Sequence, residues 1–252
     1  MARKKSNLVY FNYVIFFLLG FILASAVFVS STTLFASEKN ELEPVAQEVM
    51  YASSNVVAVK GEGGEGILGS VDIEIRPGKG RVLMNTNPFL EPDTQFSAET
   101  AVAVAQETTG KSLKDRDVIL SFNMPGQVLG GPSAGAAMTT AVVAAIEGKT
   151  VNNKTAITGT IEADGHIGQI GGVIEKAKAA ADQNITVFLV PKGQLRFTYY
   201  EQNVEQRRIG RFIYQTINYI PRTVDLNNYT MQFGMETKEV YNITEAVGYM
   251  LV

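Results

Sequence analysis

The sequence predicts an α/β (α+β) fold, in which helices pack on a mixed sheet and one N-terminal transmembrane helix precedes it. Three observations predict this: an uncharged apolar stretch near the N-terminus, short strand-like runs separated by Gly and Pro, and alternating strand-like and helix-like runs further on. The 252 residues, 46% of them hydrophobic, suffice for a sizeable core. We expect a transmembrane anchor or signal segment over 1–36, a connector over 37–55, and a globular domain over 56–252 with an insertion near 193–228.

The apolar stretch is long enough to cross a bilayer. Residues 6–37 contain no charged side chain, and residues 8–29 are almost wholly apolar. At about 1.5 Å of rise per residue, the latter span roughly 33 Å as a helix, against about 30 Å for a bilayer core. Basic residues precede the stretch, at Arg3, Lys4 and Lys5, and Glu38 is the first charge after it. The positive-inside rule therefore predicts a single-pass cell-membrane protein with its globular domain outside the cytoplasm.

A cleaved signal peptide, followed by secretion, is the alternative interpretation of the same stretch. Small-residue cleavage sites occur at Ala24-Ser25-Ala26 and at Phe35-Ala36. The apolar region of a signal peptide is typically only about 7 to 15 residues long. The length of the stretch therefore favours an uncleaved anchor.

The remaining elements follow from periodicity and from Gly and Pro punctuation. We expect a polar, helix-prone connector over 37–52 and then strands over 56–60, 67–76 and 81–85. A helix over 94–106, capped by Asp93 and ended by Gly110, precedes a strand over 117–122 and an apolar helix over 133–147. The final expected elements are a strand over 156–161, a helix from Gly171-Gly172 to about 182, a strand over 185–190, an amphipathic insertion over 193–228, and a closing strand and helix over 229–252.

Composition excludes several classes of function. The chain has no cysteine, which rules out thiol nucleophiles, thiolate metal sites and disulfides. It has one histidine, His166. The net charge is −3, and no long basic run follows the first five residues, so we expect no nucleic-acid partner.

A candidate nucleophile lies where a loop meets the amino end of the apolar helix, in Gly131-Pro132-Ser133-Ala134-Gly135. Free NH groups and the helix dipole there favour negative charge, which would stabilise an attacking alkoxide and the oxyanion that its attack forms. Ser133 as a simple helix cap is the alternative. The segment also satisfies Gly-x-Ser-x-Gly, the α/β-hydrolase elbow, but that fold would require His166, which follows too closely to leave room for the intervening sheet.

A lysine could replace histidine as the base if burial lowers its pKa toward neutrality. The helix opened by Gly171-Gly172 carries Lys176 and Lys178. Two residues apart, they point to different helix faces, and periodicity does not distinguish them. A solvated lysine is the alternative for both.

The segment 117–192 resembles the proteolytic domain of Lon peptidases, and most closely the stand-alone secreted or membrane-anchored archaeal members. Three ordered motifs carry the resemblance: Gly-Pro-Ser-Ala-Gly at 131–135 followed by Ala136-Ala137-Met138, Ala156-Ile157-Thr158-Gly159, and Gly171-Gly172-Val173-Ile174-Glu175-Lys176. The resemblance implies that Ser133 is the nucleophile, that Lys176 rather than Lys178 is the general base, and that Thr158 contacts the lysine. It implies the Lon proteolytic fold for 56–252, no cofactor and no metal.

The sequence also departs from that family. Lon proteins normally carry an ATPase, yet Gly148-Lys149-Thr150 is only a near miss to a phosphate-binding loop, with Val143 where its first glycine would stand, and is better interpreted as a helix end. Gly130 replaces an acidic residue that often precedes Gly-Pro-Ser, and Pro125-Gly126-Gln127 lies where Pro-Glu-Gly is common.

These features together predict a membrane-anchored, ATP-independent serine endopeptidase that hydrolyses peptides or unfolded protein segments by a Ser-Lys dyad. The expected partners are such substrates and the membrane through the N-terminal helix, and the sequence leaves open whether copies of the chain form a homo-oligomer. The alternative is a catalytically silent Lon-fold binding or scaffold protein at the membrane.

Overall fold

The structure is a computed structural model that describes all residues except 1–10, 26–48, 62–63, 86 and 126–127. The chain divides into two compact units, Met1–Ala46 and Gln47–Val252. In the first unit, residues 11–25 form a helix with exposed side chains. None of the helices in the described ranges is both long and apolar enough to cross a membrane. The expected span over 8–29 extends past this helix at both ends, and its residues 8–10 and 26–29 lie outside the described ranges. Residues 37–48 of the expected connector also lie outside them.

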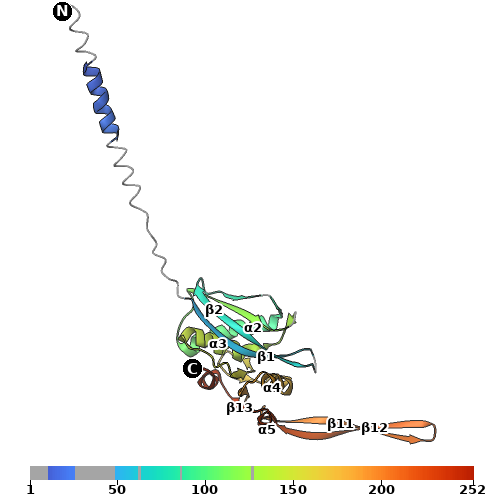
Figure 1. Ribbon diagram of the computed structural model, residues 1–252. Coiled ribbons are helices and arrows are strands. Elements are labelled where there is room, and N and C mark those ends of the chain that lie inside the picture. The colour runs from blue at the N-terminus through green and yellow to red at the C-terminus, as the bar shows by residue number, and fades with distance from the viewer. Residues whose placement is uncertain (1–10, 26–48, 62–63, 86, 126–127) are drawn as a thin grey trace, which may run out of the picture. The chain divides into compact units, whose positions relative to one another are not determined.

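A four-stranded sheet forms one layer of the second unit (Figure 1). Its strands lie in the order β1 (Met50–Val59), β2 (Gly66–Pro77), β5 (Arg116–Asn123) and β3 (Val82–Met84). The pairs β1–β2 and β2–β5 are antiparallel, whereas β3 and β5 are parallel. The expectation of helix-prone structure up to residue 52 is wrong for 50–52. These residues begin β1, because Met50 pairs with Ile75 and Ala52 turns into the core.

Two helices, α2 (Pro92–Thr109) and α3 (Gly135–Glu147), pack against each other, and α3 also packs on β1 and β2. Every residue of α3 from Gly135 to Ile146 is buried, as its apolar sequence predicts. Both helices end at glycines in the left-handed region, Gly110 and Gly148, which confirms the predicted stops. The prediction of Asp93 as the cap of α2 is wrong, because Glu91 is the N-cap and Pro92 the first helical residue. Proline suits this position, since the first NH groups of a helix have no partner within the helix and the missing NH of proline costs no hydrogen bond.

A second, parallel sheet has the order β13 (Glu236–Val240), β10 (Val187–Pro191) and β7 (Thr155–Ile157). The helix α4 (Val173–Asp182) buries an apolar face in a cluster around Phe188. The expected strand over 156–161 is interrupted at Thr158 and Gly159, after which β8 (Thr160–Ile161) pairs with β9 (Ile167–Gly168). The remaining elements are β4 (Phe89–Leu90), which pairs with β6 (Val128–Leu129), and the helices η1 (Pro132–Ala134), α5 (Leu226–Met231) and α6 (Ile243–Met250).

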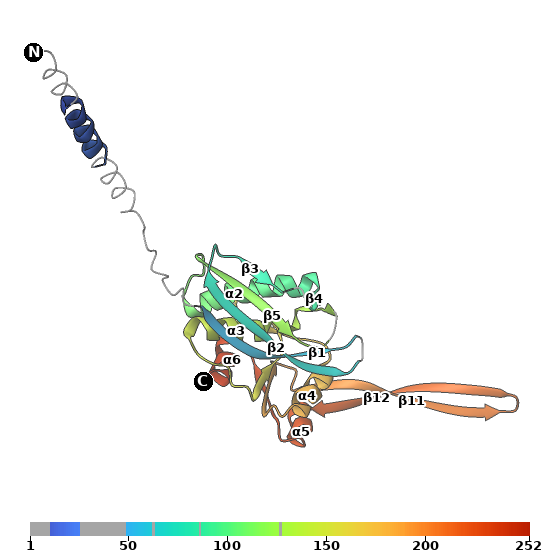
Figure 2. The ribbon, with the colours of Figure 1, turned by 45° about the horizontal axis from the view of Figure 1, so that its top comes forward.

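The insertion is a long antiparallel hairpin of β11 (Arg196–Ile209) and β12 (Phe212–Asp225), which projects from the rest of its unit (Figure 2). Each strand has 14 residues, so the hairpin is roughly 46 Å long at about 3.3 Å per residue. Its two ends lie together, because the NH of Leu226 donates to the carbonyl of Leu195 at 2.8 Å.

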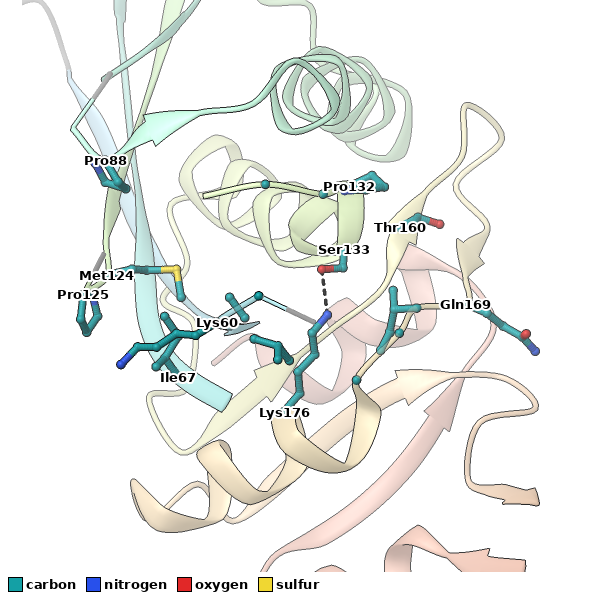
Figure 3. A pocket seen from close by; sticks show the side chains of 18 residues that line it. Lys60, Ile67, Pro88, Met124, Pro125, Pro132, Ser133, Thr160, Gln169 and Lys176 are labelled. Atoms are coloured by element: carbon teal, nitrogen blue, oxygen red, sulfur yellow. Dashed lines mark hydrogen bonds between the residues drawn. The ribbon is translucent and has the colours of Figure 1, made fainter. Parts of the chain in front are cut away.

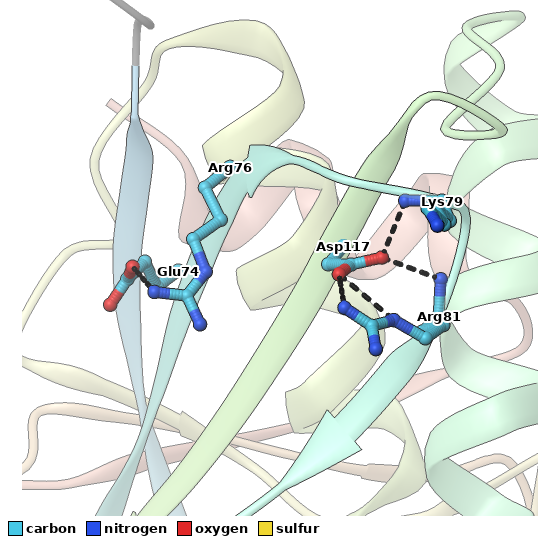
Figure 4. A network of polar contacts seen from close by, with 5 residues as sticks. All are labelled: Glu74, Arg76, Lys79, Arg81 and Asp117. Atoms are coloured by element: carbon cyan, nitrogen blue, oxygen red, sulfur yellow. Dashed lines mark hydrogen bonds and ion pairs between the residues drawn. The ribbon is translucent and has the colours of Figure 1, made fainter.

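A buried carboxylate holds the turn between β2 and β3 against β5 (Figure 4). Asp117, whose side chain is 4% exposed, accepts hydrogen bonds from the backbone NH groups of Lys79 at 2.8 Å and Arg81 at 3.0 Å, and it forms an ion pair with the Arg81 guanidinium. These donors hold the pKa of Asp117 well below its usual range. Nearby, Glu74 and Arg76 form an exposed ion pair at 3.6 Å.

Candidate active site

A cavity of about 670 Å³ opens where the end of β1, the start of η1 and the start of α4 meet (Figure 3). Ser133 and Lys176 both line it. Most of the other lining side chains are apolar and come from β1, β2 and the loops before β4, after β5 and before α4: Ala58, Val59, Ile67, Pro88, Met124, Pro125 and Ile170. The cavity is large enough for a peptide side chain and its adjoining backbone, and its walls suit an apolar group.

Ser133 is presented by a single turn of 3-10 helix that leads into α3. Gly131 makes this turn possible, because its φ of 86° lies in a region that favours glycine. Neither η1 nor α3 is capped by a side chain, so the alternative in which Ser133 merely caps the helix is wrong. The hydroxyl is instead half-buried at the edge of the cavity.

The backbone around Ser133 is tied to the interruption between β7 and β8. The NH of Gly159 donates to the Ser133 carbonyl at 3.0 Å, and the NH of Ala136 donates to the Gly159 carbonyl at 3.1 Å. These two bonds fix the start of α3. Ser133 is in the first turn of η1, and among the described residues no acceptor outside that turn takes its NH. An NH at the start of a helix can bind developing negative charge.

Lys176 lies in the first turns of α4 and reaches the serine. Its Nζ is 2.8 Å from Ser133 Oγ and 3.3 Å from Thr158 Oγ1. Gly172, with a φ of 66°, starts the helix, and the flanking residues Val173 and Ala177 bury its inner face. Only 4% of Lys176 is exposed. The side chain therefore crosses the apolar interior to arrive at the hydroxyl.

Burial changes the proton affinity of Lys176. An ammonium group in this setting loses most of its hydration, which lowers the pKa of Lys176 from 10.5 to about 8. At neutral to mildly alkaline pH, an appreciable fraction of the amine is then neutral, with a lone pair available to the Ser133 hydroxyl. An exposed lysine would be almost wholly protonated in the same range.

Thr158 joins the serine and the lysine. It is fully buried, and its backbone NH still donates to Leu189 in β10 at 3.1 Å. Its hydroxyl lies 3.3 Å from the Ser133 carbonyl, to which it donates, and receives the hydrogen bond from Lys176. The threonine hydroxyl thus restricts the lysine amine to the side of the cavity where Ser133 lies.

Two residues that the sequence left as alternatives lie elsewhere. Lys178 is exposed on the opposite face of α4. His166 is in the turn between β8 and β9, where its ring packs edge-on against Tyr241 with centroids 4.4 Å apart. Neither lines the cavity. The structure therefore brings together Ser133, Thr158 and Lys176, and it leaves the histidine of a hydrolase triad apart from them.

One acidic side chain beside the site was missed in the sequence. Glu91 directs its carboxylate over Gly130, where any Cβ on Gly130 would collide with it. The glycine that replaces an acidic residue in the motif thus leaves space for a carboxylate from a distant position. Nothing in the sequence around Glu91 indicates this neighbour. The other departure, in residues 125–127, falls partly outside the described residues.

The mixed α/β fold and the serine-centred cavity are those of a serine peptidase. The family model described as Lon protease (S16) C-terminal proteolytic domain matches residues 36–199. The chain belongs to this family, which confirms the resemblance seen in its motifs.

Curated relatives agree with this assignment. The chain is 29% identical over 145 residues to an archaeal Lon protease of Archaeoglobus fulgidus, covering 56% of this chain and 23% of the relative. It is 30% identical over 129 residues to Lon protease 1 of Bacillus subtilis, covering 49% and 16%. An archaeal Lon protease of Thermoplasma acidophilum is 32% identical over 90 residues, covering 36% and 14%. The chain thus spans less than a quarter of the length of each of these relatives.

Proposed function

We propose that this protein is a membrane-anchored, ATP-independent serine endopeptidase that hydrolyses peptides or unfolded protein segments with a Ser133–Lys176 dyad. The observation that carries the proposal is the 2.8 Å contact between Lys176 Nζ and Ser133 Oγ at the wall of a cavity. The burial that lowers the pKa of Lys176 to about 8 suits the amine to accept a proton.

The reaction proceeds through an acyl-enzyme. Neutral Lys176 takes the proton of Ser133 as Oγ forms a bond to the carbonyl carbon of the peptide, and the carbonyl oxygen becomes an oxyanion near the Ser133 NH. The oxyanion collapses, the carbon–nitrogen bond breaks, and Lys176 returns the proton to the leaving amine. Water then gives a proton to Lys176 while its oxygen attacks the ester, and Ser133 regains the proton as it leaves. Thr158 keeps the amine in place throughout.

Independence from ATP is supported by the region that most resembles a nucleotide-binding loop. Gly148 is the left-handed C-cap of α3, so Gly148-Lys149-Thr150 ends a helix, whereas a phosphate-binding loop would precede one. A peptidase that does not use ATP cannot drive unfolding, so the proposed substrates are peptides or segments that are already unfolded.

Attachment to the membrane is supported by the uncharged residues 6–37 and by the basic residues before them. We place the peptidase domain outside the cytoplasm on this basis. Retention of the full chain in the pellet after an alkaline carbonate wash, together with digestion of the domain by protease added to intact cells, tests this arrangement. Release into the wash, or protection from the protease, would contradict it.

The decisive experiment measures cleavage of casein by the full chain without ATP, beside the Ser133→Ala and Lys176→Ala variants. We expect cleavage by the parent, loss of it in both variants, and no added rate with ATP. Lys178→Ala is the matched control, because that lysine lies on the same helix but is exposed, and it should retain full activity. A folded parent that cleaves neither casein nor short peptides would favour the scaffold protein.

A further inference from the structure

The β11–β12 hairpin has no protein surface to pack on over most of its length. Apart from Ile220, its residues from Tyr200 to Thr223 whose side chains are described are exposed. An isolated two-stranded hairpin is at best marginally stable in water, and large exposed apolar patches mark surfaces that bind something. The hairpin is therefore a candidate for contact with a partner outside its own unit.

The apolar side chains become denser toward the end of the hairpin and surround it there. Ile209 pairs with Phe212 next to the turn, and on the opposite face Ile213 stands across from Arg208. Ile209 is 55% exposed, Phe212 is 70% exposed and Ile213 is 67% exposed. The neighbouring Tyr214 is 55% exposed. Tyr214, two residues after Phe212, lies on the face of Ile209 and Phe212. A protein partner docked on that face would still leave Ile213 in water, whereas a lipid bilayer surrounds an inserted tip on all sides.

The charges of the hairpin are also divided along its length. Near the base, Arg196 pairs with Asp225 and Arg222 pairs with Glu201, each at 2.9 Å. At the tip, Arg207, Arg208 and Arg211 have no ion pair with any described residue, and residues 206–215 include no acidic side chain. A tip with three unpaired positive charges, on a chain whose net charge is −3, is complementary to an anionic surface.

Pairing of the hairpin with a second copy fits these features less well. Strand addition would use the outer edges, but Pro221 removes an NH from β12, and charged residues such as Glu205 interrupt β11. Two tips in contact would bring six arginines together without acidic partners. Aromatic and aliphatic side chains mixed with arginine are instead typical of segments that lie in the headgroup region of a membrane.

We propose that the hairpin tip, residues 207–214, inserts into the interfacial region of a membrane that contains anionic lipids. Phe212, Ile213, Ile209 and Tyr214 enter the boundary between headgroups and acyl chains, and the arginines bind lipid phosphates. The hairpin would then act as a strut that orients the cavity of Ser133 relative to the bilayer surface. This proposal does not rest on peptidase activity, because Ser133→Ala should leave the contact unchanged.

The chain contains no tryptophan, so a single introduced one reports on its own surroundings. The full chain carrying Phe212→Trp is compared with the full chain carrying Phe96→Trp, which places the probe on α2, where Phe96 is 67% exposed. Both are reconstituted into vesicles of brominated phosphatidylcholine with or without phosphatidylglycerol. In anionic vesicles, we expect Phe212→Trp to emit at shorter wavelength and to be quenched several-fold more strongly than Phe96→Trp.

Charge dependence is tested on the same reporter with two matched pairs of substitutions. Arg207→Gln with Arg208→Gln should reduce the quenching in anionic vesicles several-fold, whereas Arg196→Gln with Arg222→Gln, which removes as many charges near the base, should reduce it less. Equal quenching of the two tryptophans, or none for either, would overturn the proposal. A blue shift without bromine quenching would overturn it in favour of contact between copies, and equal quenching with and without phosphatidylglycerol would remove the role of the arginines.

Discussion

Lys176 Nζ lies 2.8 Å from Ser133 Oγ, although the two residues are 43 positions apart in the chain. The contact joins the start of α4 to the turn before α3, and both helices pack on β1 and β2. This contact between a buried amine and a serine hydroxyl determines how activity and stability should change with pH and with substitution of either residue.

Peptidase activity should increase with pH up to the pKa of Lys176. Only the neutral amine can accept the Ser133 proton, and burial lowers its pKa to about 8. The kcat/KM for a peptide substrate should therefore rise about tenfold per pH unit well below pH 8 and level off above it. A rate that is flat between about pH 6 and 9 would contradict this role of the lysine.

Replacing Lys176 with methionine should stabilise the protein at neutral pH. The folded chain holds this amine at a pKa of about 8 against 10.5 when unfolded, so below pH 8 the buried charge costs about 3 kcal/mol before its hydrogen bonds are counted. Between pH 8 and 10.5 the unfolded state binds more protons, so the parent gains stability with rising pH. Urea unfolding should show Lys176→Met more stable by about 1 to 3 kcal/mol at pH 7, with the gap narrowing toward pH 10.

Lys178→Met is the control for that measurement, because its side chain is exposed. This substitution should change the unfolding free energy by no more than about 0.5 kcal/mol. It should leave the pH dependence of that free energy unchanged. A Lys176→Met variant less stable than the parent at pH 7 would show that the hydrogen bonds to Ser133 and Thr158 outweigh the desolvation of the charge.

Removal of the Thr158 hydroxyl should weaken catalysis without unfolding the protein. Thr158→Val keeps the shape of the side chain but loses its bonds with Lys176 Nζ and the Ser133 carbonyl, both at 3.3 Å. One hydrogen bond of about 1 to 1.5 kcal/mol corresponds to a loss of roughly tenfold in kcat/KM. Thr158→Ser should restore most of the activity. Parental kinetics in Thr158→Val would argue that the threonine serves packing alone.

A methyl group at Gly135 should disturb the start of α3. A Cβ there would lie 2.7 Å from Ile161 Cγ2, 2.8 Å from the Ile161 backbone nitrogen and 2.8 Å from Ser97 Oγ. Backbone cannot yield cheaply, so Gly135→Ala should lower the unfolding free energy by about 1 to 3 kcal/mol and reduce cleavage. Gly248→Ala in α6, where nothing lies within 4 Å, should be neutral or stabilising. Equal stability of both variants would refute the crowding.

The network around Asp117 should contribute to stability in a pH-dependent way. Its pKa is depressed in the folded state, so its contribution is present at neutral pH and is lost as the pH falls through the folded-state pKa. Asp117→Asn should lower the melting temperature at pH 7 by several degrees, and the difference should shrink in strong acid. The exposed ion pair between Glu74 and Arg76 provides the control. Because exposed ion pairs contribute little to stability, Glu74→Gln should leave the melting temperature nearly unchanged.

Local patterns predicted the elements whose burial is one-sided or complete. The apolar run before Gly148 indicated α3, and alternation indicated β2 and β5, because in each case the core imposes its period on the sequence. Motif order, rather than periodicity, selected Lys176 over Lys178. Two lysines on opposite faces of a short helix differ only in which face the rest of the fold covers, and the sequence of the helix alone does not reveal that.

Other features depended on contacts between distant segments. The interruption at Thr158 exists because Gly159 bonds to the backbone of Ser133 and Ala136, which no pattern within 156–161 reveals. The expectation that the insertion is amphipathic is wrong over most of the hairpin, because both faces of β11 and β12 are exposed there and no core selects one of them. The carboxylate of Glu91 over Gly130 depends likewise on tertiary packing.

The hairpin leaves and rejoins its unit at one point, where Leu195 and Leu226 are hydrogen-bonded. A segment whose ends already touch can be lengthened, shortened or removed by a change in the gene at a single place, with no strand elsewhere changing its partner. During evolution, the length of the β11–β12 hairpin could therefore change without any change in the residues of the cavity. Relatives with the same sheets could thus carry hairpins of different lengths, or a short turn in their place.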